Sequence, residues 1–212
     1  MALKRLFDII CSSLGVILLS PVIIVIAAII LIEDRFPVFY RGVRVGRYGK
    51  LFRIYKYRSM VRNAESVGGD STADDDPRIT RIGKFLRKYK LDELPQLINV
   101  LKGDMSIVGP RPEIRKYVDQ YNEEEKQILT VRPGITDWAS IWNADEGALL
   151  AGAKDPDRAY EELIRPTKLK LQLKYVRERS FFTDMKIIFL TMLAVIQPES
   201  KALKQFKISG TL

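Results

Sequence analysis

The stretch IICSSLGVILLSPVIIVIAAIILI, residues 9–32, decides the fold class of this chain. It contains 24 consecutive residues without a charge. As a straight helix it would reach roughly 36 Å, against about 30 Å for the hydrocarbon core of a membrane. A cleaved signal peptide would be shorter, and no small-residue cleavage site separates this run from the basic region that follows. We therefore predict a membrane segment in residues 1–35.

Ser20-Pro21 lies near the middle of this segment. Proline removes a backbone N–H and clashes with the preceding turn, so we expect a bend there, with the Ser20 hydroxyl satisfying a freed backbone group. Both flanks are basic, with Lys4 and Arg5 before the run and Arg35 after it. Both ends should then lie on the cytoplasmic side, which indicates a re-entrant hairpin; a kinked helix that crosses the membrane fits these features equally well.

Composition limits the chemistry. The 212 residues suit one domain with a membrane element, and 35 Lys and Arg against 26 Asp and Glu give a net charge of +9. The partner should therefore be anionic: lipid headgroups, nucleotide phosphates or nucleic acid. With no His and only Cys11, the chain has no disulfide, no usual zinc site and no His-based triad. A metal would be a hard ion held by carboxylates, such as Mg²⁺.

The remaining chain predicts an α+β fold, mostly helical, with a short β element. Residues 37–60 are typical of strands and turns, and Lys56 and Arg58 lie at spacing two on one strand face. The predicted helices cover residues 79–90, 114–129, 158–164, 168–177 and 181–196. The last is either a core helix or an interfacial one, and its basic approach favours the interfacial reading. Three parts result: a membrane hairpin (1–35), a catalytic domain with interfacial helices (36–198) and a tail (199–212).

Asp92 and Glu93 lie in the stretch Leu91–Pro95, where Pro95 and the apolar spacing predict a helix from near Asp92 to Gly103. An Asp at a helix start is most often only an N-cap. Two neighbouring features point to more. The helix before the pair carries a basic face that includes Arg87. Beyond the pair, Arg111 stands between Pro110 and Pro112, which hold its backbone as a phosphate site requires.

Several ordered motifs carry a resemblance to a known family. They are Lys4-Arg5-Leu6-Phe7-Asp8, Ser20-Pro21, the basic strand around Lys56 and Arg58, residues 76–83, residues 91–99, residues 102–113 and residues 132–136. Over residues 3–195 the chain resembles the bacterial sugar transferases, the monotopic phosphoglycosyl transferases that start glycan assembly on a lipid carrier. The resemblance implies a phosphotransferase at the cytoplasmic face of the bacterial inner membrane, with a re-entrant helix broken at Ser20-Pro21.

The implied reaction joins a nucleoside diphosphate sugar, usually a UDP-sugar, to polyprenyl (undecaprenyl) phosphate and releases a nucleoside monophosphate. By motif match, Asp92 would be the nucleophile that forms a covalent phosphosugar intermediate, and Glu93 would help to hold Mg²⁺. The resemblance further implies that Lys56, Arg58, Arg87, Arg111 and Glu113 bind substrate. Membrane lipid is an expected partner and nucleic acid is not. A homodimer is compatible with the chain, although no motif argues for one.

One stretch departs from the family pattern. Family members commonly follow Pro-Gly-Ile-Thr with Gly-Trp-Ala-Gln and Asn-Gly, whereas this chain continues Asp137-Trp138-Ala139-Ser140-Ile141-Trp142-Asn143. A gapless comparison places Asp145 as a further substrate-binding residue. The identity of the sugar therefore does not follow from the resemblance.

Two other hypotheses remain open. A basic membrane adaptor without enzymatic activity would explain the charge, but neither the Asp92-Glu93 pair nor the proline-flanked Arg111. The same transfer could also proceed by direct attack of the lipid phosphate, without a covalent intermediate. Trapping of a phosphosugar on Asp92 separates this mechanism from the covalent one.

Overall fold

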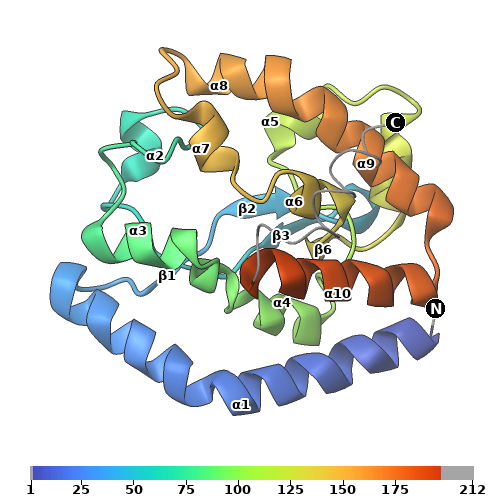
Figure 1. Ribbon diagram of the computed structural model, residues 1–212, viewed down its shortest axis with the longest axis horizontal. Helices are drawn as coiled ribbons and strands as arrows, with labels where there is room; N and C mark the ends of the chain where they lie inside the picture. The colour runs from blue at the N-terminus through green and yellow to red at the C-terminus, as the bar shows by residue number, and fades with distance from the viewer. Residues whose placement is uncertain (1, 197–212) are drawn as a thin grey trace.

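The computed structural model describes residues 2–196, so the predicted tail at 199–212 lies outside the described residues. Figure 1 shows a mostly helical domain with a few short strands at its centre and one long helix beneath it. This arrangement confirms the α+β, mostly helical prediction.

Helix α1 (Ala2–Asp34) is one continuous helix of 33 residues that contains Pro21 and curves along the domain (Figure 1). Pro21 has no N–H to give to the carbonyl of Ile17, and the Ser20 hydroxyl donates to that carbonyl instead, at 2.8 Å. The predicted role of Ser20 is thus confirmed. By length and composition alone, α1 could cross a membrane.

The strands form three two-stranded sheets in the described part of the chain. Antiparallel pairs join β1 (Phe39–Tyr40) to β4 (Lys56–Tyr57) and β2 (Val43–Val45) to β3 (Leu51–Arg53), with the 3-10 turn η1 (Arg47–Gly49) between the latter two. These elements confirm the strands expected within 37–60. A parallel pair, β5 (Ser106–Val108) with β6 (Gly134–Thr136), was not predicted.

The helices before β5 follow their local signals. They are α2 (Ala64–Val67), α3 (Arg81–Lys88), the 3-10 turn η2 (Leu91–Glu93) and α4 (Gln96–Lys102). Thr80 caps α3 by accepting from Gly83 N at 3.0 Å. The predicted helix from Asp92 divides into η2 and α4 around Pro95, and it ends at Gly103 (φ 87°) as expected.

The second half of the chain contains shorter helices followed by two long ones. They are α5 (Arg115–Val118), η3 (Glu125–Thr130), α6 (Trp138–Trp142), α7 (Glu146–Leu150), α8 (Pro156–Ala159), the π-helical η4 (Tyr160–Ile164), α9 (Arg165–Glu178) and α10 (Phe181–Ile196). The continuous helix predicted for 114–129 is wrong. Asn122 and Glu125 exchange side-chain and main-chain hydrogen bonds at 2.9 Å, which starts a new turn and ends the first helix.

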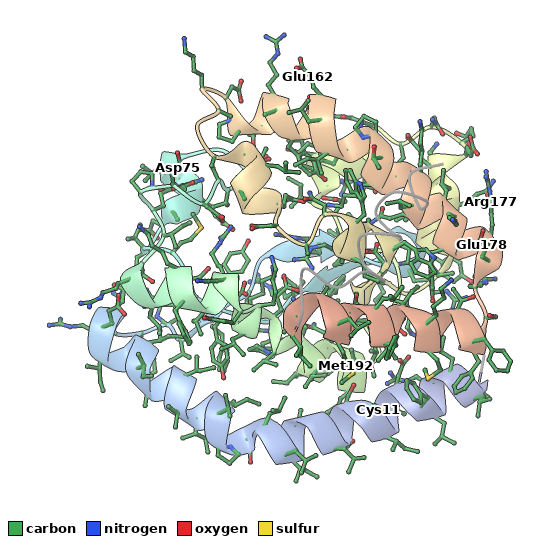
Figure 2. All side chains as sticks on the ribbon, viewed as in Figure 1. Cys11, Asp75, Glu162, Arg177, Glu178 and Met192 are labelled. Carbon is green, nitrogen blue, oxygen red and sulfur yellow. The ribbon has the colours of Figure 1, made fainter. Side chains whose placement is uncertain are left out.

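Helix α10 has two different faces. Ile187 and Leu190 are buried in a core with Val108, Trp138 and Tyr175. The opposite face leaves large apolar side chains exposed, among them Phe182 (84 %), Phe189 and Met192. Figure 2 shows Met192 on the side of α10 that is turned toward α1 in this view, with Asp75 and Glu162 on the far side of the domain. The helix is therefore both a core helix and an apolar surface helix.

Both ends of α1 are tied to the domain. Near the N-terminus, Lys4 Nζ lies 2.5 Å from Asp184 on α10, and the buried Asp8 accepts from the Ile107 main-chain N–H at 3.0 Å. At the other end, the guanidinium of Arg58 lies 3.0 Å from the carboxylate of Asp34. A helix held at both ends lies along the domain.

Candidate active site

Glu93 is the centre of a partly buried ion cluster. Lys56 Nζ donates to Glu93 Oε1 at 2.8 Å, and Arg111 NH1 donates to Oε2 at 3.0 Å while its other terminal nitrogen contacts Oε1. The Glu93 side chain is 12 % exposed. Bidentate, charge-assisted pairs of this kind are among the stronger polar contacts in proteins. Lys56 comes from β4, Glu93 from η2 and Arg111 from the segment after β5, so the fold assembles the cluster from distant parts of the sequence.

The electrostatics keep this cluster charged. Burial alone would raise the pKa of Glu93, but Arg111 and Lys56 outweigh it and hold that pKa well below the ordinary glutamate value. Burial lowers the pKa of Lys56, and the opposing attraction of Glu93 does not fully cancel this effect. Glu93 in turn raises the pKa of Arg111. Glu93 is therefore ionised at neutral pH, and it lies between Lys56 and Arg111.

Asp92 lies in the same turn as Glu93 but in a different environment. It is 7 % exposed, and no cation lies within ion-pair distance of it among residues 2–196. Burial raises its pKa, and Glu93 adds to that effect, while Lys56, Arg87 and Arg111 lower it from further away. No cap hydrogen bond is made by a side chain at the start of η2 or α4. The N-cap role is therefore not the one that Asp92 performs here.

Arg87 belongs to the same group of charges. It lies in the last turn of α3, and its charge acts on both Asp92 and Asp74. The structure thus brings together five of the predicted site residues, three cations and two carboxylates: Lys56, Arg87, Asp92, Glu93 and Arg111. Their net positive charge suits a diphosphate, and the buried carboxylate among them is a candidate nucleophile.

Two predicted residues lie elsewhere. Arg58 is buried at the end of α1, where its guanidinium donates to the main-chain carbonyls of Asp34 and Arg35 at 2.9 and 2.7 Å. Lys56 and Arg58 were predicted to share one strand face. This prediction is wrong, because the strand β4 ends at Tyr57. Arg58 anchors the C-terminal end of α1.

Glu113 forms a second ion cluster. Its carboxylate lies 2.5 Å from Lys168 Nζ and accepts from the Tyr160 hydroxyl at 2.9 Å. Burial would raise the pKa of Glu113, but Lys168 and Tyr160 outweigh it and lower that pKa. Within residues 2–196, the partners of the Glu113 carboxylate come from α9 and the π-helical turn before it. The geometry assigns it a packing contact beside the site.

Asp145 is exposed and begins α7, where it accepts from Ala148 N at 3.4 Å. It also faces Asp74, whose pKa is raised by burial and by Asp145, against the lowering effect of Arg87. The next residue, Glu146, acts electrostatically on Arg111. The stretch that departs from the family pattern, Asp137 with α6, therefore leads to the rim of the Asp92 site.

A metal at this site would have few protein ligands. Within residues 2–196, no three His, Cys, Asp or Glu side chains gather as a metal-binding group. Mg²⁺, however, is commonly held by one or two carboxylates together with substrate phosphates and water. Asp92 and Glu93 supply such a pair, although Glu93 is already engaged by Lys56 and Arg111. The donor set fits a Mg²⁺ ion that arrives with a diphosphate.

Sequence reasoning missed Asp137 and Gln172, both fully buried. Asp137 Oδ2 accepts from the main-chain N–H of Arg111 at 3.1 Å, and Gln172 Nε2 donates to the Arg111 carbonyl at 3.2 Å. The signal for Asp137 was present, because an Asp three residues before a Ser at a helix start is a capping pattern. Gln172 has no such signal and emerges only from the packing of α9.

Comparison with known proteins defines the class. The family model described as "Bacterial sugar transferase" matches residues 1–198. The chain belongs to this family, as the motifs around Asp92 and Arg111 implied.

Three similar proteins give this membership its context. A UDP-N-acetylgalactosamine-undecaprenyl-phosphate N-acetylgalactosaminephosphotransferase of Aeromonas hydrophila is 38 % identical, over 92 % of this chain and 44 % of that protein. A UDP-glucose:undecaprenyl-phosphate glucose-1-phosphate transferase of Escherichia coli K12 is 39 % identical, over 90 % and 39 %. The sugar transferase EpsL of Bacillus subtilis strain 168 is 37 % identical, over 94 % and 90 %. The chain thus spans less than half of the first two relatives and nearly all of the third.

Proposed function

We propose that this protein is a phosphotransferase that moves a sugar 1-phosphate from a nucleoside diphosphate sugar to polyprenyl phosphate and releases a nucleoside monophosphate. The names of the Aeromonas and Escherichia relatives specify undecaprenyl phosphate as acceptor and a UDP-linked sugar as donor. Their identity to this chain falls on the part that contains the Asp92 cluster. The product would be the first lipid-linked intermediate of a bacterial glycan.

The observation that carries the proposal is the buried Asp92 carboxylate beside three cations. A free carboxylate with a raised pKa, close to Lys56, Arg87 and Arg111, is a group prepared to act on a polyanion. Glu93 has a different task, since it is bound by Lys56 and Arg111 and orients both. A basic adaptor would have no use for a buried carboxylate at this position.

In the first step, an Asp92 oxygen attacks the phosphorus that carries the sugar. The bond from that phosphorus to the bridging oxygen breaks, and the nucleoside monophosphate leaves with the electron pair. In the second step, an oxygen of polyprenyl phosphate attacks the same phosphorus, and Asp92 leaves as a carboxylate. Nucleophiles and leaving groups are anions at neutral pH, so Lys56, Arg87 and Arg111 stabilise charge and no histidine is needed.

Mg²⁺ is part of the proposal. Glu93 and Asp92 would hold it together with the diphosphate oxygens, and the ion would neutralise charge that develops on the leaving phosphate. Arg111 and Lys56 keep Glu93 ionised and in place for this contact.

We also place the protein on the cytoplasmic face of the bacterial inner membrane, with α1 as a re-entrant helix. Two features support this placement: the curvature of α1, which contains Pro21 (Figure 1), and the attachment of both ends of α1 to one domain through Asp184 and Arg58. Polyprenyl phosphate would then reach Asp92 from the headgroup level.

The test measures nucleoside monophosphate release by detergent-purified protein from a panel of UDP-sugars, with undecaprenyl phosphate and Mg²⁺. We expect release that requires Mg²⁺ and Asp92, and an Asp92→Asn variant at least about a thousandfold slower, as for the loss of a covalent nucleophile. The matched control is Asp104→Asn, which replaces an Asp outside the cluster and should retain activity. Equal rates for wild type and Asp92→Asn would refute the proposal.

A second measurement distinguishes covalent transfer from direct attack. Donor labelled in the sugar should leave a phosphosugar on the protein when acceptor is omitted, and peptide mapping should place it on Asp92. Turnover without any trapped adduct, even after rapid quenching, would favour direct attack of the lipid phosphate.

A further inference from the structure

Asp137 is a buried carboxylate that the proposed reaction does not use. It is 0 % exposed, and its hydrogen-bond donors in the described part of the chain are all uncharged. Burying an ionised carboxylate is costly unless several donors compensate for the lost water. Asp137 therefore accepts hydrogen bonds here that a smaller or apolar side chain could not accept.

The hydrogen-bond donors to Asp137 come from three separate parts of the chain. Asp137 Oδ1 accepts from the main-chain N–H and the hydroxyl of Ser140, both at 2.7 Å, which starts α6. Asp137 Oδ2 accepts from Arg111 N at 3.1 Å and, more weakly, from Gln172 Nε2 at 3.4 Å. Gln172 Nε2 also donates to Arg111 O at 3.2 Å. Both main-chain polar groups of Arg111 are thus held by buried side chains.

The backbone around Arg111 needs this support. Arg111 is in no helix or strand, and Pro110 and Pro112 on either side have no N–H to donate. Its neighbours are secured by main-chain bonds, since Pro110 O accepts from Gly134 N and Glu113 O accepts from Val45 N. Within residues 110–113, Arg111 is the residue that has both of its main-chain groups bound by side chains.

We propose that Asp137 and Gln172 are positioning residues that clamp the main chain of Arg111 and so aim its guanidinium at Glu93 and at the substrate diphosphate. The proposal rests on the proposed function. Asp137 and Ser140 both stand where this chain departs from the family pattern, and both belong to the clamp. The departure therefore gives this chain its own means of fixing Arg111.

The first test compares Asp137→Asn with Asp155→Asn. Asp155 is also an N-cap, accepting from Arg158 N at 3.0 Å at the start of α8, and it contacts no residue of the clamp. Displacing a catalytic group by about 1 Å can cost a hundredfold in rate, so we expect Asp137→Asn to lower kcat/KM by about ten- to a hundredfold. Asp155→Asn should change it less than about twofold.

A double-mutant cycle tests whether the effect passes through Arg111. In an Arg111→Ala background, Asp137→Asn should lower kcat/KM by less than about twofold more, because the group that it positions is gone. If the whole factor persists in that background, Asp137 acts on something else and the proposal is overturned. Gln172→Met, which keeps the side-chain volume but removes the donor, provides the same cycle if Asp137→Asn does not fold.

Hydrogen exchange separates this inference from the proposed function. In the peptide 107–113, Asp137→Asn should speed the exchange of the Arg111 amide, while main-chain amides other than those of Arg111 and Ser140, the two that Asp137 accepts from, exchange as in wild type. This result is expected whether or not the wild-type protein turns over any sugar donor. Unchanged exchange at Arg111 would overturn the clamp, whereas a wild type without transferase activity would overturn only the proposed function.

Discussion

Asp92 and Glu93 are adjacent residues whose pKa values are shifted in opposite directions. Glu93 contacts two cations, and its pKa is well below the ordinary value. Among residues 2–196 Asp92 contacts no cation, and burial raises its pKa. Neighbouring carboxylates with separated pKa values commonly divide the work of a site. Here the ionised Glu93 organises the cations, and Asp92 retains free oxygen atoms.

The raised pKa of Asp92 predicts the pH dependence of transfer. A protonated carboxyl group cannot attack phosphorus, so kcat/KM should fall as the pH drops through the pKa of Asp92, above the ordinary aspartate value of about 3.9. Lys56 is the cation that lowers this pKa most, so Lys56→Met should move the acidic limb to higher pH. The measurement is a pH profile of kcat/KM.

The control for this profile is Lys84→Met, which removes an exposed charge of α3 that is not among the main causes of the shift in the Asp92 pKa. Its acidic limb should coincide with that of wild type. An acidic limb that stays in place in Lys56→Met would mean that another group titrates.

Glu113 and Lys168 form a partly buried pair whose loss should affect stability. Their side chains are 13 % and 9 % exposed. Removing one partner leaves the other charge buried, which costs about 3–5 kcal/mol and, for a chain of this size, about 6–20 °C in Tm. We therefore expect Lys168→Met to unfold at lower temperature in detergent than the double variant Glu113→Gln with Lys168→Met.

The stability contributed by Glu113 also has a definite pH dependence. Because its pKa is lowered in the folded protein, the contribution is fully present above the unfolded value of about 4.3 and is lost as the pH falls through the folded pKa. The Tm difference between wild type and Glu113→Gln should shrink in acid. If Glu113 instead bound substrate, its substitution would change KM and leave Tm unaltered.

At the scale of elements, local signals predicted the structure where they were strong. The periodicity and polar boundaries of residues 181–196 gave α10 its bounds, and Gly103 ended α4 where a left-handed residue was required. The reciprocal hydrogen bonds between Asn122 and Glu125 divide the single helix that was predicted over residues 114–129. Periodicity does not detect such a local competitor.

Long-range pairing could not be predicted in the same way. The three-residue strands β5 and β6 can pair because the main chain at Gly109 and Gly134 approaches closely. Gly134 permits this approach, since a Cβ there would meet Gly109 N at 2.1 Å. The site residues are a different case, because the order of motifs did identify them and the fold brings them together: Lys56, Arg87, Asp92, Glu93 and Arg111. The directions of Arg58 and Glu113 depended on where α1 and α9 pack, which no local pattern contains.

The curvature of α1 predicts that both ends of this helix lie on the same side of a membrane (Figure 1). In a Cys11→Ser background, single cysteines introduced as Leu3→Cys and Phe36→Cys replace side chains that are exposed at the two ends. Both should react with an impermeant maleimide from the same side of sealed vesicles. With Pro21→Ala added, the Ile17 carbonyl regains an N–H partner, and a straighter helix should weaken one end contact.

The opposite result is equally clear. Labelling of Leu3→Cys and Phe36→Cys from opposite sides of the vesicle would show a helix that crosses the membrane. The purified, detergent-solubilised variants serve as the control, since both cysteines should react completely there.

On the whole molecule, exposed apolar side chains form one surface on α1 and a second on α10. Ile32 and Phe182 are almost fully exposed, and exposed apolar patches of this kind mark membrane contacts. We expect membrane binding to depend on this surface more than on the net charge of +9. At about 1 M salt, where the Debye length is about 3 Å, the protein should remain with sedimented membranes.

Detergent should release the protein from the same membranes. Phe182→Asp with Phe189→Asp should increase the fraction that high salt releases, because it places charge on the exposed face of α10 while the buried Ile187 face stays intact. Release of the wild type by salt alone would mean that charge dominates the attachment.

The contact between Lys4 and Asp184 has a consequence for the order of events during synthesis. These two residues are 180 positions apart, and ribosomes add about 5–20 residues each second. The N-terminal end of α1 therefore waits roughly 10–35 s for its partner on α10. Meanwhile the most apolar segment of the described chain has no protein surface to cover it, so a nascent chain of this kind needs the membrane or a chaperone before its own domain is complete.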